Sequence, residues 1–151
     1  MELTHFNKAK NELMLATKID EVKEIRDKAE ALRAYAKQAG ESLEMQNQCA
    51  EIKIRAERRA GELIPEQITI GRPEKGSHDV TLKDMGIEKM QSHRWQAIAS
   101  VPEEKFEEHI ATTKADKKEL TSISVYRLAK KEEQKAGNYI NLLPFGGQVL
   151  T

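Results

Sequence analysis

The sequence has little of several residue types, and each shortage excludes a class of protein. Its 151 residues include one cysteine, Cys49, so neither an intrachain disulfide nor a CxxC metal or redox motif can form. Aromatic residues make up only 5% and hydrophobic residues 38%, which argues against an all-β domain with a large core. Basic and acidic residues number 25 each, so no excess of one charge points to a partner.

Long apolar runs are also missing. No stretch approaches the ~20 apolar residues that a helix needs to cross a bilayer. The first residues, Met1 to His5, have neither the basic nor the apolar part of a signal peptide. We therefore expect a cytoplasmic protein that does not contact a membrane.

The motifs of the common enzyme classes are absent as well. No glycine-rich loop precedes a helix, and no GxSxG or Walker-like run occurs. The four histidines, His5, His78, His93 and His109, do not have the spacing of a zinc protease. The acidic pairs at 103–104 and 107–108 favour a solvated first helical turn over paired catalytic carboxylates. We expect a protein that is not an enzyme and that holds no metal or cofactor.

Charged residues are abundant, at 33%, and their arrangement predicts an all-α fold. Between Thr17 and Gly40 apolar residues recur every three or four positions, as on the seam of a coiled coil. The members of this seam are Val22, Ile25, Ala29, Leu32, Ala36 and Ala39. The helix begins with either Thr17 or Asp20 as its N-cap, and the sequence does not separate these two starts.

A second run with the same spacing extends from Met45 to Leu63 and is expected to stop at Pro65. Helices over 17–39 and 42–63 with a short connection at Gly40 predict an antiparallel hairpin. One long helix that tolerates Gly40 is the alternative. Because both seams are rich in alanine and poor in bulk, we expect a second copy to complete the packing. This predicts a homodimer through residues 17–63.

Changes in composition divide the chain into four segments. They are an N-terminal helical hairpin for self-association over 1–64, which includes a short helix at 4–16, a linker at 65–80, a helix-turn-helix domain over 81–137, and an apolar tail at 138–151. Within the third segment we expect helices over 89–100, from Pro102 onward, and from about Thr121 to Gly137. The tail is apolar enough to dock on this chain or on a partner protein.

Residues 81–99 carry the parts of a helix-turn-helix unit in the right order. Thr81 and Asp84 predict a capping box that starts a short supporting helix at Leu82–Met85. Gly86 predicts the tight turn, and Ile87 is the apolar residue that follows it. The inward side would hold Leu82, Met85, Ile87, Trp95, Ile98 and Ala99. The outward side of the second helix would then be free to enter the major groove of DNA.

The candidate DNA-binding residues lie on the outward side of this second helix and in the linker. They are Lys89, His93, Arg94 and Gln96 on the second helix, with Arg72 and Lys75 of the linker. Arginine and lysine pair with guanine, glutamine pairs with adenine, and lysine or protonated histidine binds phosphate. Gly71-Arg72-Pro73 resembles the core of a minor-groove hook.

Three stretches also resemble a known group of proteins. They are residues 24–39, the run Ile54–Leu63 (IRAERRAGEL), and residues 84–96 with Asp84-Met85-Gly86-Ile87 and Gln91-Ser92-His93-Arg94-Trp95-Gln96. They look like small phage, prophage and plasmid proteins whose C-terminal half is similar to the helix-turn-helix part of the ParB/KorB group. The resemblance covers roughly residues 15–130 and implies a DNA-binding or regulatory protein of a mobile element. The helical hairpin stands where that group has a nucleotide-binding domain, so its CTP chemistry is not implied.

Three functional hypotheses follow. The first is a non-enzymatic protein that reads double-stranded DNA through the helix-turn-helix. The second is a phage-encoded helical protein that binds another protein, such as a host factor or a defence system, with the tail at 138–151 as part of its docking surface. The third, an accessory subunit of a DNA-modifying enzyme, combines the two.

Overall fold

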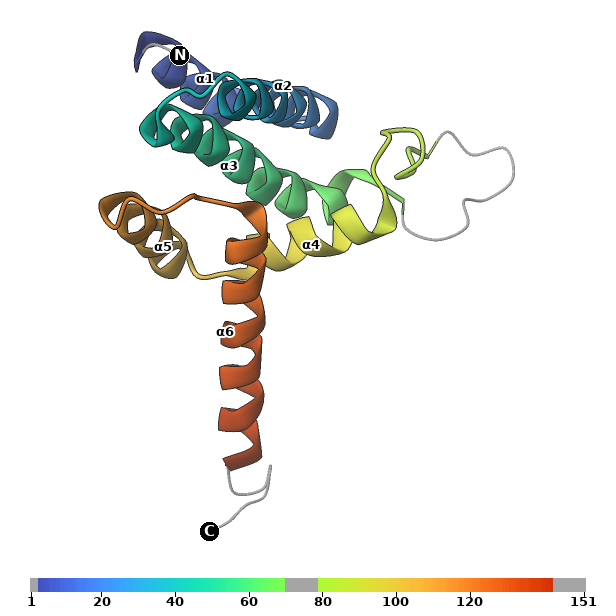
Figure 1. The fold of residues 1–151 in the computed structure, drawn as a ribbon. Coiled ribbons are helices and arrows are strands. Elements are labelled where there is room, and N and C mark those ends of the chain that lie inside the picture. Colours follow the sequence, from blue (N-terminus) through green and yellow to red (C-terminus); the bar gives the residue numbers. More distant parts are fainter. Residues whose placement is uncertain (1–2, 70–78, 143–151) are drawn as a thin grey trace.

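A computed structural model of the chain describes residues 3–69 and 79–142, with side chains over 6–69 and 79–137. Over these residues it is entirely helical, which confirms the predicted all-α class (Figure 1). The helices are α1 (Leu3–Leu15), α2 (Ile19–Gln38), α3 (Leu43–Gln67), α4 (Lys89–Ser100), α5 (Glu103–Ala115) and α6 (Ser122–Leu142). None of the helices in this part of the chain is apolar over a length that could span a bilayer.

The connection between α2 and α3 breaks the chain into the predicted antiparallel hairpin. Gly40 adopts a left-handed φ of 73°, which glycine reaches without steric cost. The Glu41 N–H donates to the Ala36 carbonyl at 2.9 Å, and this bond closes the end of α2. Ser42 then caps α3, because its hydroxyl accepts from the Met45 N–H at 3.1 Å. The alternative of one continuous helix is therefore wrong.

The heptad seam of α2 packs inside its own chain. Val22 and Ala29 are buried against α3 or α1, and Ala36 is buried as well, whereas Leu32 remains exposed. The incomplete seam that suggested a second copy is thus largely filled by α3. The homodimer through residues 17–63 stays a prediction.

Helix α2 begins at Ile19, so both predicted N-caps, Thr17 and Asp20, are wrong. The side chain of Gln67, at the C-terminal end of α3, caps the start of α2 instead of a side chain next to it in the sequence. The Ile19 N–H donates to the Gln67 side-chain oxygen at 2.8 Å, and the Gln67 amide donates to the Thr17 carbonyl at 2.6 Å. This tertiary cap satisfies a backbone donor that α2 leaves without a helical partner.

Two predicted helix ends are also wrong. α3 continues through Pro65 to Gln67, and α6 continues through Gly137 to Leu142. A proline in the last turn removes one backbone bond, and the Gln67 contacts hold the residues beyond it. A glycine inside a helix costs only about 1 kcal/mol against alanine, so α6 can pass through it.

α3 is the central element of the fold. Figure 1 shows it between the pair α1 and α2 on one side and α4 on the other. It contributes to three buried clusters, through Ala56, Ala60, Leu63 and Ile64 to the first, Ala50 and Ile54 to the second, and Ile52 to the third. The first cluster also takes Trp95 from α4, and the second takes Phe106 from α5 and Val125 from α6. The predicted hairpin and helix-turn-helix segments therefore share one buried core.

The crossing of α3 and α4 is so close that no side chain fits between the two backbones. A Cβ atom on Gly61 would lie 2.0 Å from the Trp95 carbonyl oxygen and 2.9 Å from the Gln96 nitrogen. Both distances are shorter than a van der Waals contact. The atoms in the way belong to the Trp95 and Gln96 backbone, which cannot rotate aside as a side chain could. Gly61 thereby sets the distance at which α4 lies on α3.

Replacing Gly61 by alanine should destabilise the protein. Gly61→Ala forces α4 away from α3, and we expect a loss of about 1–3 kcal/mol of unfolding free energy, the usual range for overpacking. The matched control is Gly137→Ala, because a Cβ there meets nothing within 4 Å. That variant should gain up to about 1 kcal/mol from helix propensity. Urea denaturation followed by circular dichroism measures both, and a neutral Gly61→Ala would contradict the close crossing.

Candidate nucleic-acid interface

The segment before α4 forms the predicted capping box, but the short supporting helix expected at Leu82–Met85 is wrong, because residues 82–86 form a hydrogen-bonded turn and no helix. The Thr81 N–H donates to Asp84 Oδ2 at 3.0 Å, and the Asp84 N–H donates to Thr81 Oγ1 at 3.2 Å. Gly86 has a left-handed φ of 67° and closes a single turn over residues 82–86. Ile87 after it is buried in the core with Trp95. α4 then begins at Lys89, as predicted.

One face of α4 is committed to the core. Ser92, Trp95 and Ile98 are buried, and the Ser92 hydroxyl accepts from the Gln96 amide at 3.0 Å. The predicted inward residue Ala99 is half-buried. Ser92, at a position where a branched apolar residue is usual, is buried because Gln96 satisfies its hydroxyl.

The opposite face of α4 is largely exposed to solvent, with α6 beside His93 and Arg94. Lys89, His93 and Arg94 are exposed, as the predicted DNA-binding role requires. Met90 beside them is 56% exposed. Gln96 is half-buried and one N–H of its amide donates to Ser92, which leaves its second N–H and its carbonyl oxygen uncommitted among the described contacts. The other two candidates, Arg72 and Lys75, lie outside the described residues.

The structure adds residues of α6 that the sequence did not single out. The Tyr126 ring lies edge-on to His93 at 6.2 Å between centroids. The Arg94 guanidinium is 5.9 Å from the Tyr126 centroid, and Lys130 Nζ is 5.4 Å from it. Such cation–π contacts orient the two cations beside one aromatic ring. Residues more than 30 positions apart thus form one surface with α4, and no spacing in the sequence indicates it.

The charge of this surface is modestly positive. Arg127 is exposed on α6 beside it, and Lys130 makes an ion pair with Glu133 at 3.4 Å. The Glu133 carboxylate raises the pKa of Lys130, so the ammonium stays charged at neutral pH. A phosphate would compete with that exposed carboxylate for Lys130, which limits the attraction.

The basic stretch of α3 serves the fold instead of forming part of this surface. Lys53, Arg55 and Arg58 each contact a neighbouring helix, and Arg59 pairs with Glu62 of α3 itself. Arg55 pairs with Glu107 of α5, and Arg58 donates to the Ile98 carbonyl at 2.8 Å. Lys53 joins Glu30 of α2 at 3.0 Å. The Arg33 guanidinium, together with this ammonium, lowers the pKa of Glu30 to about 2. These cations are therefore committed to ion pairs and carbonyls.

Buried polar side chains of α3 position the start of α6 and hence Tyr126. Asn47 donates to the Lys118 carbonyl and accepts from the Leu120 N–H, both at 2.9 Å. Glu57, almost fully buried, accepts from Arg26 Nε at 2.9 Å and from the Ser122 hydroxyl at 2.5 Å. These contacts tie the entry of α6 to α3.

A histidine and a serine also meet between α5 and α6. His109 Nε2 lies 3.0 Å from Ser124 Oγ, a distance suited to a catalytic pair. The Ser124 hydroxyl, however, donates to the Thr121 carbonyl at 2.7 Å, so it must accept from the imidazole N–H. The histidine is then the donor and cannot take the serine proton. Cys49 is buried, and burial raises the pKa of its thiol, which disfavours a reactive thiolate.

In comparisons with known proteins, no family model, no curated protein and no solved structure matches this chain.

Replacing Glu57 by glutamine should loosen the entry of α6. Glu57→Gln removes the charge that faces Arg26 inside the protein, and we expect a loss of about 1.5–3 kcal/mol, the cost of a charged hydrogen bond. Glu62→Gln is the matched control, since its ion pair with Arg59 is exposed. That change should stay within about 0.5 kcal/mol. Urea denaturation compares the two, and equal effects would contradict the role of Glu57.

The stability of the protein should fall in mild acid because of His109. Burial lowers the pKa of His109 below its usual 6.5, so the unfolded chain binds a proton more readily than the folded one. The stabilisation is complete above about pH 6.5 and is lost as pH falls through the lower folded pKa. His109→Gln keeps a donor for Ser124 and does not titrate. Urea denaturation at pH 7.5, 6.5 and 5.5 measures the unfolding free energy of both proteins. As the pH falls, the wild type should lose more unfolding free energy than His109→Gln. A constant difference would contradict this assignment.

Proposed function

We propose that this chain is a non-enzymatic DNA-binding protein that reads double-stranded DNA through α4. The observation that carries the proposal is the two-sided character of this helix. Ser92, Trp95 and Ile98 are fixed in the core, while Lys89, His93 and Arg94 are exposed on the other side. A capped turn over residues 82–86 with a left-handed Gly86 precedes α4, in the place of the first helix of a helix-turn-helix.

The dimensions of α4 suit the major groove. Its 12 residues extend about 18 Å at 1.5 Å per residue, and the groove is about 12 Å wide. Arg94 could form a bidentate pair with guanine, and Lys89 at the helix start could reach a base edge or a phosphate. Gln96 could read adenine through its carbonyl oxygen and the amide N–H that does not donate to Ser92.

α6 would contact the sugar-phosphate backbone beside the groove. In Figure 1 it leaves the body of the protein next to α4 and projects away from α3. Tyr126 supplies a hydroxyl, and Arg127 and Lys130 supply charge on this part of α6. Because the chain carries equal numbers of acidic and basic residues, non-specific binding should be weak. A second copy on a repeated or palindromic site would double these contacts.

The resemblance of residues 15–130 to phage, prophage and plasmid proteins supports a regulatory role on a mobile element. Under this proposal the protein acts in a bacterial cytoplasm and is associated with the nucleoid when it is bound to DNA. The accessory-subunit role is compatible with the same interface, because such a subunit also has to find DNA. A role in protein binding through the tail at 138–151 rests on side chains that lie outside the described residues. The described part of the chain offers a different surface for such a role, the groove between α1 and α2.

A double substitution on the free face of α4 tests the proposal. Pooled DNA fragments from the protein's own element are incubated with it, and the retained fragments are sequenced. The wild type should retain fragments that share one short motif, with affinity that falls as salt rises. His93→Ala with Arg94→Ala should weaken binding to that motif about 10–100-fold, because a good base contact contributes about 1–3 kcal/mol.

Lys105→Ala is the control, since Lys105 is an exposed cation that belongs to α5 and not to α4. It should keep the motif and lower affinity by less than about tenfold. Circular dichroism of each variant verifies that the helices persist. Retention of no fragment above background by the wild type, or unchanged discrimination by the double variant, would refute DNA reading through α4.

A further inference from the structure

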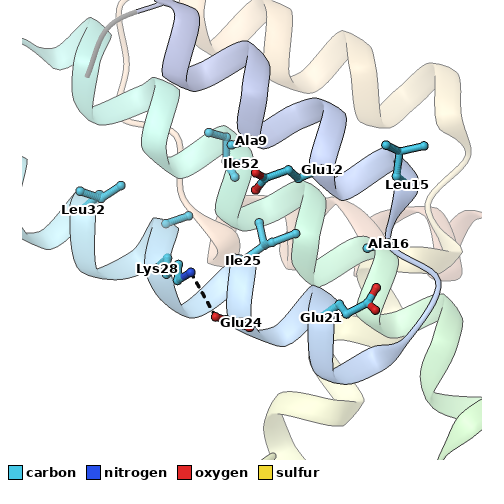
Figure 2. A pocket seen from close by; sticks show the side chains of 11 residues that line it. Ala9, Glu12, Leu15, Ala16, Glu21, Glu24, Ile25, Lys28, Leu32 and Ile52 are labelled. Atoms are coloured by element: carbon cyan, nitrogen blue, oxygen red, sulfur yellow. Dashed lines mark ion pairs between the residues drawn. The ribbon is translucent and has the colours of Figure 1, made fainter.

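An apolar groove lies between α1 and α2. It has a volume of about 470 Å³, and Figure 2 shows it from close by. Ala29 of α2 and Ile52 of α3 are buried at its floor. Leu15 of α1 and Leu32 of α2 line it with side chains that are 81% and 46% exposed. Two large aliphatic side chains are thus exposed to solvent beside one groove, which is unusual on a surface that binds no partner.

The groove follows from how the three helices pack. α1 and α2 both lie on α3, and the short connection between Leu15 and Ile19 joins their ends (Figure 1). The apolar residues of α2 form a stripe wider than α3 covers, so Val22 is buried while Ile25 is half-buried and Leu32 is exposed. A further helix laid along this channel would bury the remaining part of the stripe.

The rim of the groove is acidic. Glu12 of α1 and Glu21 and Glu24 of α2 line it, with Lys28 as its single cation. Lys28 is already paired with Glu24 at 3.1 Å. Among the described residues neither Glu12 nor Glu21 takes part in an ion pair. The rim therefore carries a net charge of −2, which selects among the molecules that its apolar floor could accept.

This charge disfavours two occupants. A second copy that presented the same face would bring three glutamates against three, with only one lysine on each side. Nucleic acid would meet the same repulsion. A segment with aliphatic residues on one face and cations beside them would satisfy both floor and rim. Helices of this kind bind apolar grooves through anchors at positions i, i+3 or i+4, and i+7.

We propose that the groove between α1 and α2 docks an amphipathic helix of another protein, with leucine-like anchors flanked by lysine or arginine. Leu15, Ile25 and Leu32 contact the anchors, and Glu12 and Glu21 pair with the flanking cations. The groove lies on the side of α3 opposite α4 (Figure 1), so docking leaves the free face of α4 open. The proposal does not depend on DNA binding.

A pair of designed peptides tests the proposal. Each is an 18-residue helix with leucines at heptad spacing and a fluorescent label, and the flanking positions are all lysine in one peptide and all glutamate in the other. Fluorescence anisotropy measures their binding to the full chain. The lysine peptide should bind at least tenfold more tightly than the glutamate peptide, and this preference should shrink at high salt.

Substitutions then locate the contact. Leu32→Asp places a charge in the groove and should weaken binding of the lysine peptide at least tenfold. Met14→Asp is the matched control, because Met14 is 80% exposed on α1 but does not line this groove. It should leave binding unchanged. Glu12→Lys with Glu21→Lys should reverse the preference toward the glutamate peptide. Circular dichroism verifies that each variant remains helical.

Several results would overturn the proposal. They are equal affinity for the two peptides, no binding at 100 µM peptide, and equal losses in Leu32→Asp and Met14→Asp. Self-association that Leu32→Asp abolishes in sedimentation would also overturn it, because the occupant would then be a second copy of this chain.

Discussion

The close crossing of α3 and α4 at Gly61 is the constraint on which the other features depend. With no side chain between the two backbones, Trp95 reaches the cluster formed by α1, α2 and α3. The next turn of α4 places Ile98 in the cluster with α5 and α6. A single small residue thus allows one short helix to join both halves of the core. The same contact fixes which side of α4 is buried, and so which side remains free.

Polar groups inside the protein do the positioning that apolar contacts cannot do alone. Asn47 and Glu57 satisfy backbone and hydroxyl groups at the entry of α6, and the hydrogen bonds they accept and donate are directional. Arg55 and Arg58 in the same helix are held by a carboxylate and a carbonyl. Much of the charge of this chain is therefore used to set the geometry between helices. The charged side chains that remain available to a partner lie on a few surfaces.

Two such surfaces lie on opposite sides of α3, and their chemistry differs. The face with Arg94, Tyr126 and Lys130 is polar and modestly positive, which suits a phosphate-bearing partner. The groove with Leu15 and Leu32 is apolar with an acidic rim, which suits a basic amphipathic helix. A zero net charge is consistent with both, because the opposite signs lie in different places. If both proposals above hold, the protein would link a DNA site to a second protein.

The sequence by itself determined the helical class, the break at Gly40, the capped turn from Thr81 to Gly86 and the start of α4. These depend on apolar spacing, glycine conformation and caps within a few residues. Only the tertiary structure decided that Gln67 caps α2, because that bond joins residues far apart in the chain. It likewise brought Tyr126 to α4 and left Leu32 uncovered. Local propensities fix where helices form, whereas the shape of packed surfaces fixes which side chains meet and which stay in water.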